Sequence, residues 1–124
     1  MKAFISFGRH NAALEKVEGC LRERGVEPVT AKEGVGVEKA LRQVDFVIIL
    51  ATGDDVVEGR RYAHQNVARE VGLAEKSHAG RIVYLLEQNA VFPTGVERGV
   101  WERFSEGEME GAFRSIEKQL GKKE

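Results

Sequence analysis

The feature of this sequence that most constrains the fold is Asp45–Ala51 (DFVIILA), in which every residue after the aspartate is apolar. A strand with one face in water alternates apolar and polar residues, whereas a strand covered on both faces is apolar throughout. This run therefore predicts a strand at the centre of a parallel sheet, with helices packed against both faces.

The segments around this run alternate between strand and helix patterns. Runs of β-branched and aromatic residues predict further strands at Lys2–Phe7, Val26–Thr30, Arg81–Leu86 and Val100–Phe104. Apolar residues at helical spacing predict helices at Ala12–Arg24, Val37–Val44, Tyr62–Ser77 and Met109–Leu120. Pro28 favours an edge position for the second strand, and we expect the fifth strand at the other edge. Loops are expected at Thr52 to about Arg61 and at Glu87–Gly99.

This alternation predicts one α/β domain over residues 1–124, with a five-stranded parallel sheet and helices on both faces. For a chain this short, the flavodoxin-like strand order 2-1-3-4-5 is the economical arrangement. In that order the first and third strands are neighbours whose connections leave in opposite directions, so that ligands bind beyond their C-terminal ends. The loops expected to flank this position are Gly8–Asn11 and Thr52–Asp55.

The composition narrows the functional classes. Lys and Arg number 19 against 20 Asp and Glu, for a net charge of -1, so there is no basic excess for binding nucleic acid. No apolar run is long enough to span a membrane, and the N-terminal residues do not form a signal peptide. The single Cys20 excludes an internal disulfide, fits a reducing cytoplasm, and is expected to be an inert core thiol. The histidines and this cysteine form no metal-binding pattern, and we expect no metal.

The stretch His64–Gly72 (HQNVAREVG) carries the clearest chemical pattern in the chain. On a helix, Asn66 and Glu70 are one turn apart and project from the same face. The helical count places Glu70 about 60° from the centre of the apolar stripe, at the edge of the face that packs on the core. A carboxylate in that place is partly desolvated and can still meet a ligand.

Several parts of the sequence together resemble a known family. Phe4-Ile5-Ser6-Phe7 in the first strand resembles the first box of Toll/interleukin-1 receptor (TIR) domains. The loop GRHN, the segment ATGDDV and the helix pattern Gln-Asn-Val-x-x-Glu-x-Gly follow in the order found in prokaryotic TIR-like proteins, a family described as predicted nucleotide-binding proteins. The resemblance covers Lys2 to about Leu86.

The resemblance implies a flavodoxin-like TIR fold and NAD glycohydrolase activity in bacterial defence or signalling. NAD would be a substrate, and no cofactor would be tightly bound. Glu70 matches the catalytic helix glutamate of active TIR enzymes, and Arg9 matches a basic residue that lines the same cleft. The loop Ala31–Gly36 matches a loop that helps to control substrate access and self-assembly, which implies homo-oligomers formed through it. The sequence departs from the better-known enzymes at Asn66, where they often place an aromatic residue against the cofactor.

The chemistry of this reaction suits a lone carboxylate. The nicotinamide of NAD is already cationic, so its departure needs no general acid, and the site must stabilise an oxocarbenium-like transition state and hold the ribose. We expect Glu70 to be catalytic, Asn66 to donate to a ribose hydroxyl or a carboxamide, and Arg9 to meet the pyrophosphate. The full set of expected substrate-binding residues is Phe7, Gly8, Arg9, Asn11, Asp54 and Asn66.

Two other functions stay open, and we rank both after the glycohydrolase. The first is a non-enzymatic module that binds a nucleotide or assembles through Ala31–Gly36. The second is an enzyme similar to nucleoside deoxyribosyltransferases, which also apply a carboxylate to an N-glycosidic bond. Without the resemblance, Glu70 would be interpreted as a solvated helix charge. His78 and Trp101 have no supporting neighbours in the sequence, and we expect them on the surface and in the core, respectively.

Overall fold

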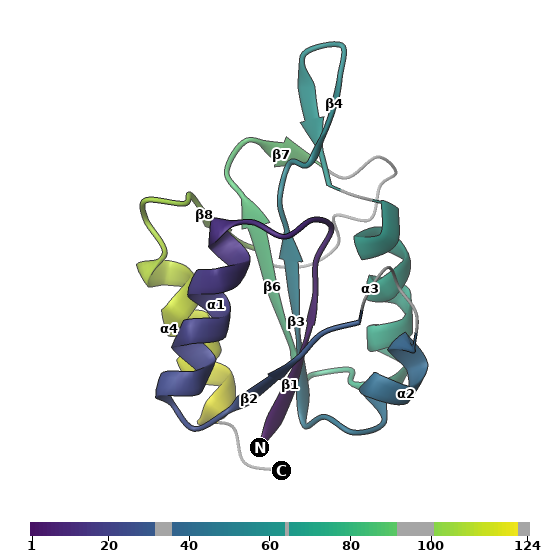
Figure 1. Cartoon of the computed structure of the whole chain (residues 1–124), viewed down its shortest axis with the longest axis vertical. Helices are drawn as coiled ribbons and strands as arrows, with labels where there is room; N and C mark the ends of the chain where they lie inside the picture. Colours follow the sequence, from purple (N-terminus) through teal and green to yellow (C-terminus); the bar gives the residue numbers. More distant parts are fainter. Residues whose placement is uncertain (32–35, 64, 92–100, 122–124) are drawn as a thin grey trace.

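The computed structural model describes residues 1–31, 36–63, 65–91 and 101–121, with the side chains of Gln65 and Asn66 outside the description. The strands of the main sheet are β1 (Lys2–Ser6), β2 (Glu27–Val29), β3 (Phe46–Ala51), β6 (Ile82–Glu87) and β8 (Glu102–Phe104). They are all parallel and lie in the order β2-β1-β3-β6-β8 (Figure 1). Counted along the chain within this sheet, that order is 2-1-3-4-5. The predicted flavodoxin-like α/β class is therefore confirmed.

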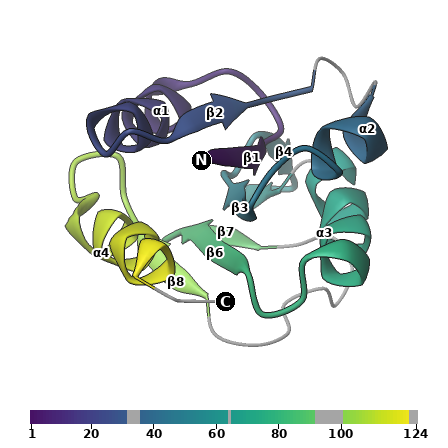
Figure 2. The same cartoon turned by 90° about the horizontal axis from the view of Figure 1, so that it is seen from below.

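The helices cover both faces of this sheet. In the described residues they are α1 (Ala12–Glu23), α2 (Val37–Leu41), α3 (Gln65–Ser77) and α4 (Glu110–Leu120). Figures 1 and 2 show α1 and α4 on one face, and α2 and α3 on the other. The start of α1 is fixed by Asn11, whose Oδ1 accepts a hydrogen bond from the Leu14 amide at 2.9 Å, as an N-cap residue does. None of these helices is long and apolar enough to cross a membrane.

The central strand β3 supplies side chains to two separate cores. Ile48 and Leu50 pack in the cluster under α1 and α4, whereas Val47 and Ile49 pack in the cluster under α2 and α3. These four side chains are fully buried. Burial of an aliphatic side chain stabilises the fold by about 1.5–3 kcal/mol, which is why the strand has no polar face. The unbroken apolar run in the sequence is thus explained by the two helical layers.

The prediction of a loop from Thr52 to about Arg61 is wrong, because this segment forms a β-hairpin. Its strands, β4 (Asp55–Val57) and β5 (Arg60–Tyr62), join β7 (Ala90–Val91) in a small second sheet of order β4-β5-β7. Glu58 and Gly59 make the turn with φ of 51° and 79°, and positive φ at both central residues is typical of a tight hairpin turn. Strands this short carry no readable alternation. β7 also lies within Glu87–Gly99, which was predicted to be a loop. Because Tyr62 belongs to β5, α3 begins at Gln65 and not at Tyr62 as predicted.

The hairpin extends the molecule beyond the C-terminal end of β3, at the top of Figure 1. Val56 and Val57 on β4 are more than half exposed. The side chains of β4 therefore add little to the core, and the hairpin depends on polar contacts at its base.

His78 was expected on the surface, and that prediction is wrong. Its side chain is buried after the C-terminal end of α3, with Nε2 3.1 Å from the carbonyl oxygen of Val44 and Nδ1 2.7 Å from the hydroxyl of Ser77. The Val44 contact spans 34 positions of sequence, so nothing local indicated it. Trp101 is half-buried against the ring of Tyr84, with ring centroids 4.9 Å apart. Cys20 is buried in the core under α1, as predicted.

Candidate functional site

The candidate site lies where β1 and β3 end. Because side chains of a strand alternate between the faces of a sheet, Ile5 packs under α1 while Phe4 packs under α3. Ser6, the last residue of β1, shares the face of Phe4. The Ser6 hydroxyl donates a hydrogen bond to Oε1 of Glu70 on α3, across 2.5 Å.

Glu70 is held by the helix that packs on this face. Val67, Val71 and Ala74 form the buried apolar stripe of α3. Glu70 directly precedes Val71, so its side chain lies beside this stripe. The Glu70 side chain is 5% exposed and Ser6 is 1% exposed, so the pair is shielded from water. The interpretation of Glu70 as a solvated helix charge is therefore wrong. A carboxylate removed from water acts more strongly on nearby charge than a surface carboxylate does.

The two loops that were expected to flank the site are joined by hydrogen bonds. The Arg9 amide donates to Oδ2 of Asp54 at 3.2 Å, and the Arg9 guanidinium donates to Oδ1 of Asp55 at 3.0 Å. Asn11 Nδ2 donates to the Thr52 hydroxyl at 3.1 Å. That hydroxyl donates in turn to Oδ1 of Asp54 at 2.8 Å. The loop after β1 and the loop after β3 therefore form one connected polar layer at the C-terminal edge of the sheet.

The carboxyl of Asp54 in this layer has a raised pKa. Burial raises the pKa of its carboxyl, and the charge of Asp55 adds to the increase. The hydrogen bonds from Thr52 and from the Arg9 amide, together with the Arg9 charge, lower the pKa, but burial outweighs them. Asp54 therefore holds its proton to a higher pH than an exposed aspartate does.

A second set of contacts fixes the base of the hairpin. Glu87, at the end of β6, accepts a hydrogen bond from the Gly53 amide at 2.8 Å and pairs with the Arg61 guanidinium at 3.0 Å. Arg61 Nε donates to the Gly53 carbonyl at 3.2 Å. A Cβ atom at Gly53 would stand 2.7 Å from Cβ of Arg61, so only glycine allows this approach. The three residues hold the β3–β4 loop, and with it Asp54, against β6.

The structure brings together only some of the predicted substrate-binding residues. Arg9, Asn11 and Asp54 meet in the polar layer, and Gly8 lies in the same loop two positions after Ser6. Phe7 is not brought to Glu70, because its side chain packs against the cluster on the α1 and α4 side.

Two further predictions lie at or beyond the limits of the described residues. Asn66 lies on α3 one turn before Glu70, with its side chain outside the description. Most of the loop Ala31–Gly36, namely residues 32–35, is also outside the described residues.

Sequence reasoning missed four residues of this region. Ser6 and Thr52 are polar residues at the C-terminal ends of buried strands, and that position in an open α/β sheet was the available indication. The sequence contained no indication that Arg61 and Glu87 belong to this region, because their partners are distant in sequence. Within the described part of the chain, no group of three or more His, Cys, Asp or Glu side chains is arranged to hold a metal ion.

Comparison with known families agrees with this geometry. The family model described as "CAP12/Pycsar effector protein, TIR domain" matches residues 2–105, a range that includes both loops, the Ser6–Glu70 pair and all five strands of the main sheet. A comparison with curated proteins gives no match. The resemblance to prokaryotic TIR-like domains is confirmed, and the chain belongs to the family of CAP12/Pycsar effector TIR domains.

Proposed function

We propose that this TIR domain is an NAD glycohydrolase in which Glu70 is the catalytic residue. The observation that carries the proposal is the buried Glu70 carboxylate, which accepts a hydrogen bond from Ser6 at the C-terminal end of β1. In open α/β sheets this is the edge at which ligands bind. Membership of an effector family fits a module that works in defence or signalling.

The proposed reaction breaks the bond between C1′ of the ribose and N1 of nicotinamide. The bonding electrons leave with nicotinamide, which becomes neutral, and positive charge develops on the ribose. A desolvated carboxylate stabilises that charge without moving a proton. Water then forms the new bond at C1′ and releases its proton, which gives ADP-ribose; attack by a group of the nucleotide itself would give a cyclic product.

The polar layer suggests how the rest of the dinucleotide would be held. The Arg9 guanidinium, now paired with Asp55, is a planar cation that suits the pyrophosphate. A pyrophosphate would have to displace Asp55 from Arg9, and the acids of this loop would repel it. Asn66, one turn from Glu70 on α3, remains our candidate for a ribose or carboxamide contact.

A non-enzymatic nucleotide-binding module is the second candidate. The observation that favours it is the 5% exposure of Glu70, since a substrate ribose needs access to the carboxylate. In the glycohydrolase proposal, that access is gained when copies of the chain assemble. The net charge of -1 offers little long-range repulsion against such assembly.

The deciding experiment measures release of nicotinamide from NAD over a hundredfold range of protein concentration, with light scattering in parallel. We expect little turnover from dilute protein and a rate that rises faster than linearly as assemblies form. Glu70→Gln should abolish turnover, while Glu110→Gln, which alters an exposed glutamate at the start of α4, should not. A rate proportional to concentration from a monomer would show that one chain makes the whole site.

Three results would remove the proposal itself. Activity that survives in Glu70→Gln would exclude the catalytic role of Glu70. Tight nucleotide binding without turnover, unchanged in Glu70→Gln, would support the binding module instead. Release of free base from deoxynucleosides, with exchange onto an added base, would identify the transferase-like alternative.

A further inference from the structure

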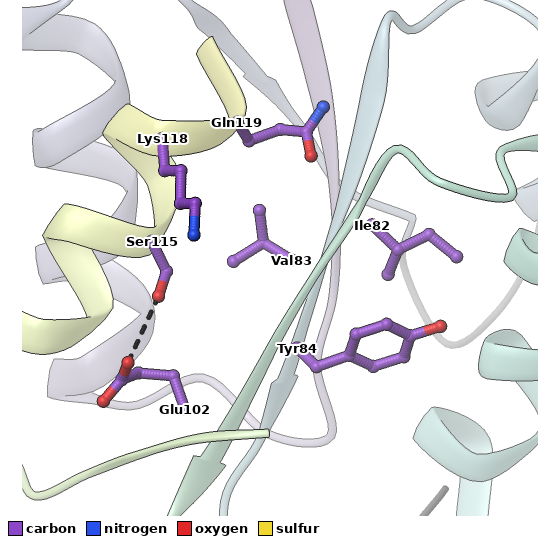
Figure 3. A pocket seen from close by; sticks show the side chains of 7 residues that line it. All are labelled: Ile82, Val83, Tyr84, Glu102, Ser115, Lys118 and Gln119. Atoms are coloured by element: carbon purple, nitrogen blue, oxygen red, sulfur yellow. Dashed lines mark hydrogen bonds between the residues drawn. The ribbon is translucent and has the colours of Figure 1, made fainter. Parts of the chain in front are cut away.

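A cavity of about 350 Å³ lies away from the candidate site, between the first half of β6 and the last turns of α4 (Figure 3). It exists because β8 is shorter than β6. The two strands pair only from Leu85 to Glu87, so among the described residues no strand covers the edge of β6 at Ile82–Tyr84. The volume falls within the range of small-molecule sites. Val83 lines the cavity on the α4 face of β6, whereas the side chains of Ile82 and Tyr84 project to the other face and line it only at the strand edge (Figure 3).

Gln119 lines this cavity and has no hydrogen-bond partner there. The residue is 9% exposed, and its side-chain amide makes no hydrogen bond to the residues that the structure describes. A primary amide offers two donors and an acceptor, and those of Gln119 are reached by water rather than sealed in the interior. The amide of Gln119 is therefore available to a polar occupant of the cavity.

Two opposite charges line the same cavity without pairing with each other. Glu102 is held in place by a hydrogen bond from the Ser115 hydroxyl at 3.4 Å and by close packing over Gly111, where a Cβ atom would stand 2.8 Å from Oε2. Lys118 reaches toward the cavity from α4 and forms no ion pair with the described residues. A side chain fixed in advance loses little entropy when a ligand binds.

We infer that this cavity is a second binding site, for a small zwitterion with an apolar side chain, such as an apolar α-amino acid. The ligand's carboxylate binds Lys118, its ammonium binds Glu102, and its apolar group lies against Val83 at the uncovered edge of β6. Gln119 donates to the carboxylate or accepts from the ammonium. An anion alone would leave Glu102 facing it, and a cation alone would face Lys118, so both charges are needed. The inference is independent of the proposed function.

The test is calorimetric titration of the purified chain with L-leucine, together with 4-methylpentanoate, which lacks the ammonium, and 3-methylbutylamine, which lacks the carboxylate. We expect leucine to bind and each analogue to bind at least tenfold more weakly. Lys118→Met, Glu102→Gln and Gln119→Met should each weaken leucine binding at least tenfold. The matched control is Arg114→Met, an exposed cation on α4 that does not line the cavity, and it should leave binding unchanged.

Thermal unfolding of each variant establishes that it is folded before binding is compared. Absence of leucine, methionine and phenylalanine binding at millimolar concentration would overturn the inference and leave a cavity that holds only water. Equal binding of leucine and 4-methylpentanoate, or equal loss in Arg114→Met and Lys118→Met, would also overturn it.

Discussion

Ser6 and Glu70 are 64 positions apart in the sequence, and the Ser6 hydroxyl donates a hydrogen bond to the Glu70 carboxylate across 2.5 Å. The bond ties the C-terminal end of β1 to the middle of α3. Because it is buried and made to a carboxylate, it belongs to the stronger class of hydrogen bonds in proteins.

Removal of this hydroxyl should cost both stability and activity. Ser6→Ala leaves a buried carboxylate oxygen without this donor, and we expect the free energy of unfolding to fall by about 1–3 kcal/mol. Under the proposed function, NAD cleavage should fall with it. Urea denaturation measures the first effect. The control is Ser105→Ala, because this half-buried serine makes only backbone hydrogen bonds to the residues that the structure describes. Equal losses in the two variants would contradict the prediction.

Two glycines should respond in opposite directions to the same substitution. Gly53→Ala places a methyl group 2.7 Å from Cβ of Arg61, so the base of the hairpin must shift, and we expect a loss of about 1–3 kcal/mol in unfolding free energy. Gly72 lies inside α3, and nothing stands within 4 Å of the position that an added methyl group would take. Gly72→Ala should therefore raise stability by about 0.5–1 kcal/mol, since alanine favours helix. Thermal and urea unfolding of both variants decide the matter, and a stabilising Gly53→Ala would exclude the tight contact.

The half-buried Asp54 carboxyl should make stability fall as pH rises. Its pKa in the folded protein is raised above the ordinary value of 3.8, so the folded state binds the proton more tightly than the unfolded state. The cost of ionising Asp54 is absent below the unfolded pKa and fully present above the folded pKa. As the pH rises from the unfolded pKa to the folded pKa of Asp54, the wild-type protein should lose stability relative to Asp54→Asn. Urea unfolding of both proteins across this window measures the difference, and carboxyl NMR should give Asp54 a midpoint above 3.8. A difference that grows in favour of wild type would contradict the assignment.

The Cys20 thiol should be unreactive toward alkylating reagents in the folded protein. Burial is the largest influence on its thiol and raises the pKa, although the charge of Arg24 opposes the shift. Little thiolate is then present at neutral pH, and reagents cannot reach the sulfur. We expect alkylation by iodoacetamide to be slow in native protein and fast in concentrated urea. Rapid native modification would show that α1 opens readily.

The main sheet was predictable because its evidence is local. The apolar run of β3 indicates that both of its faces are covered. Together with the alternation of strands and helices, this leaves few possible orders of the strands in the sheet. The position of Glu70 at the edge of the buried stripe followed from helical periodicity alone.

The hairpin and the buried histidine were not predictable in the same way. β4 and β5 are three residues each, too short for alternation, and they are fixed by contacts of Gly53, Arg61 and Glu87. His78 is buried because the carbonyl of Val44, in the connection between α2 and β3, meets its ring. The partner of Glu70 was likewise hidden, since Ser6 looks in the sequence like one more residue of a strand. Contacts between distant segments decided each of these cases.

The division of β3 between two cores has a consequence for how the domain opens. Loss of either helical layer would expose one face of a strand whose side chains are all apolar. The layers therefore cannot unfold one at a time, and they form a single cooperative unit joined through this strand. The amide hydrogens of Val47 to Leu50 should exchange with solvent only through complete unfolding, so their exchange rates report the global stability of the domain.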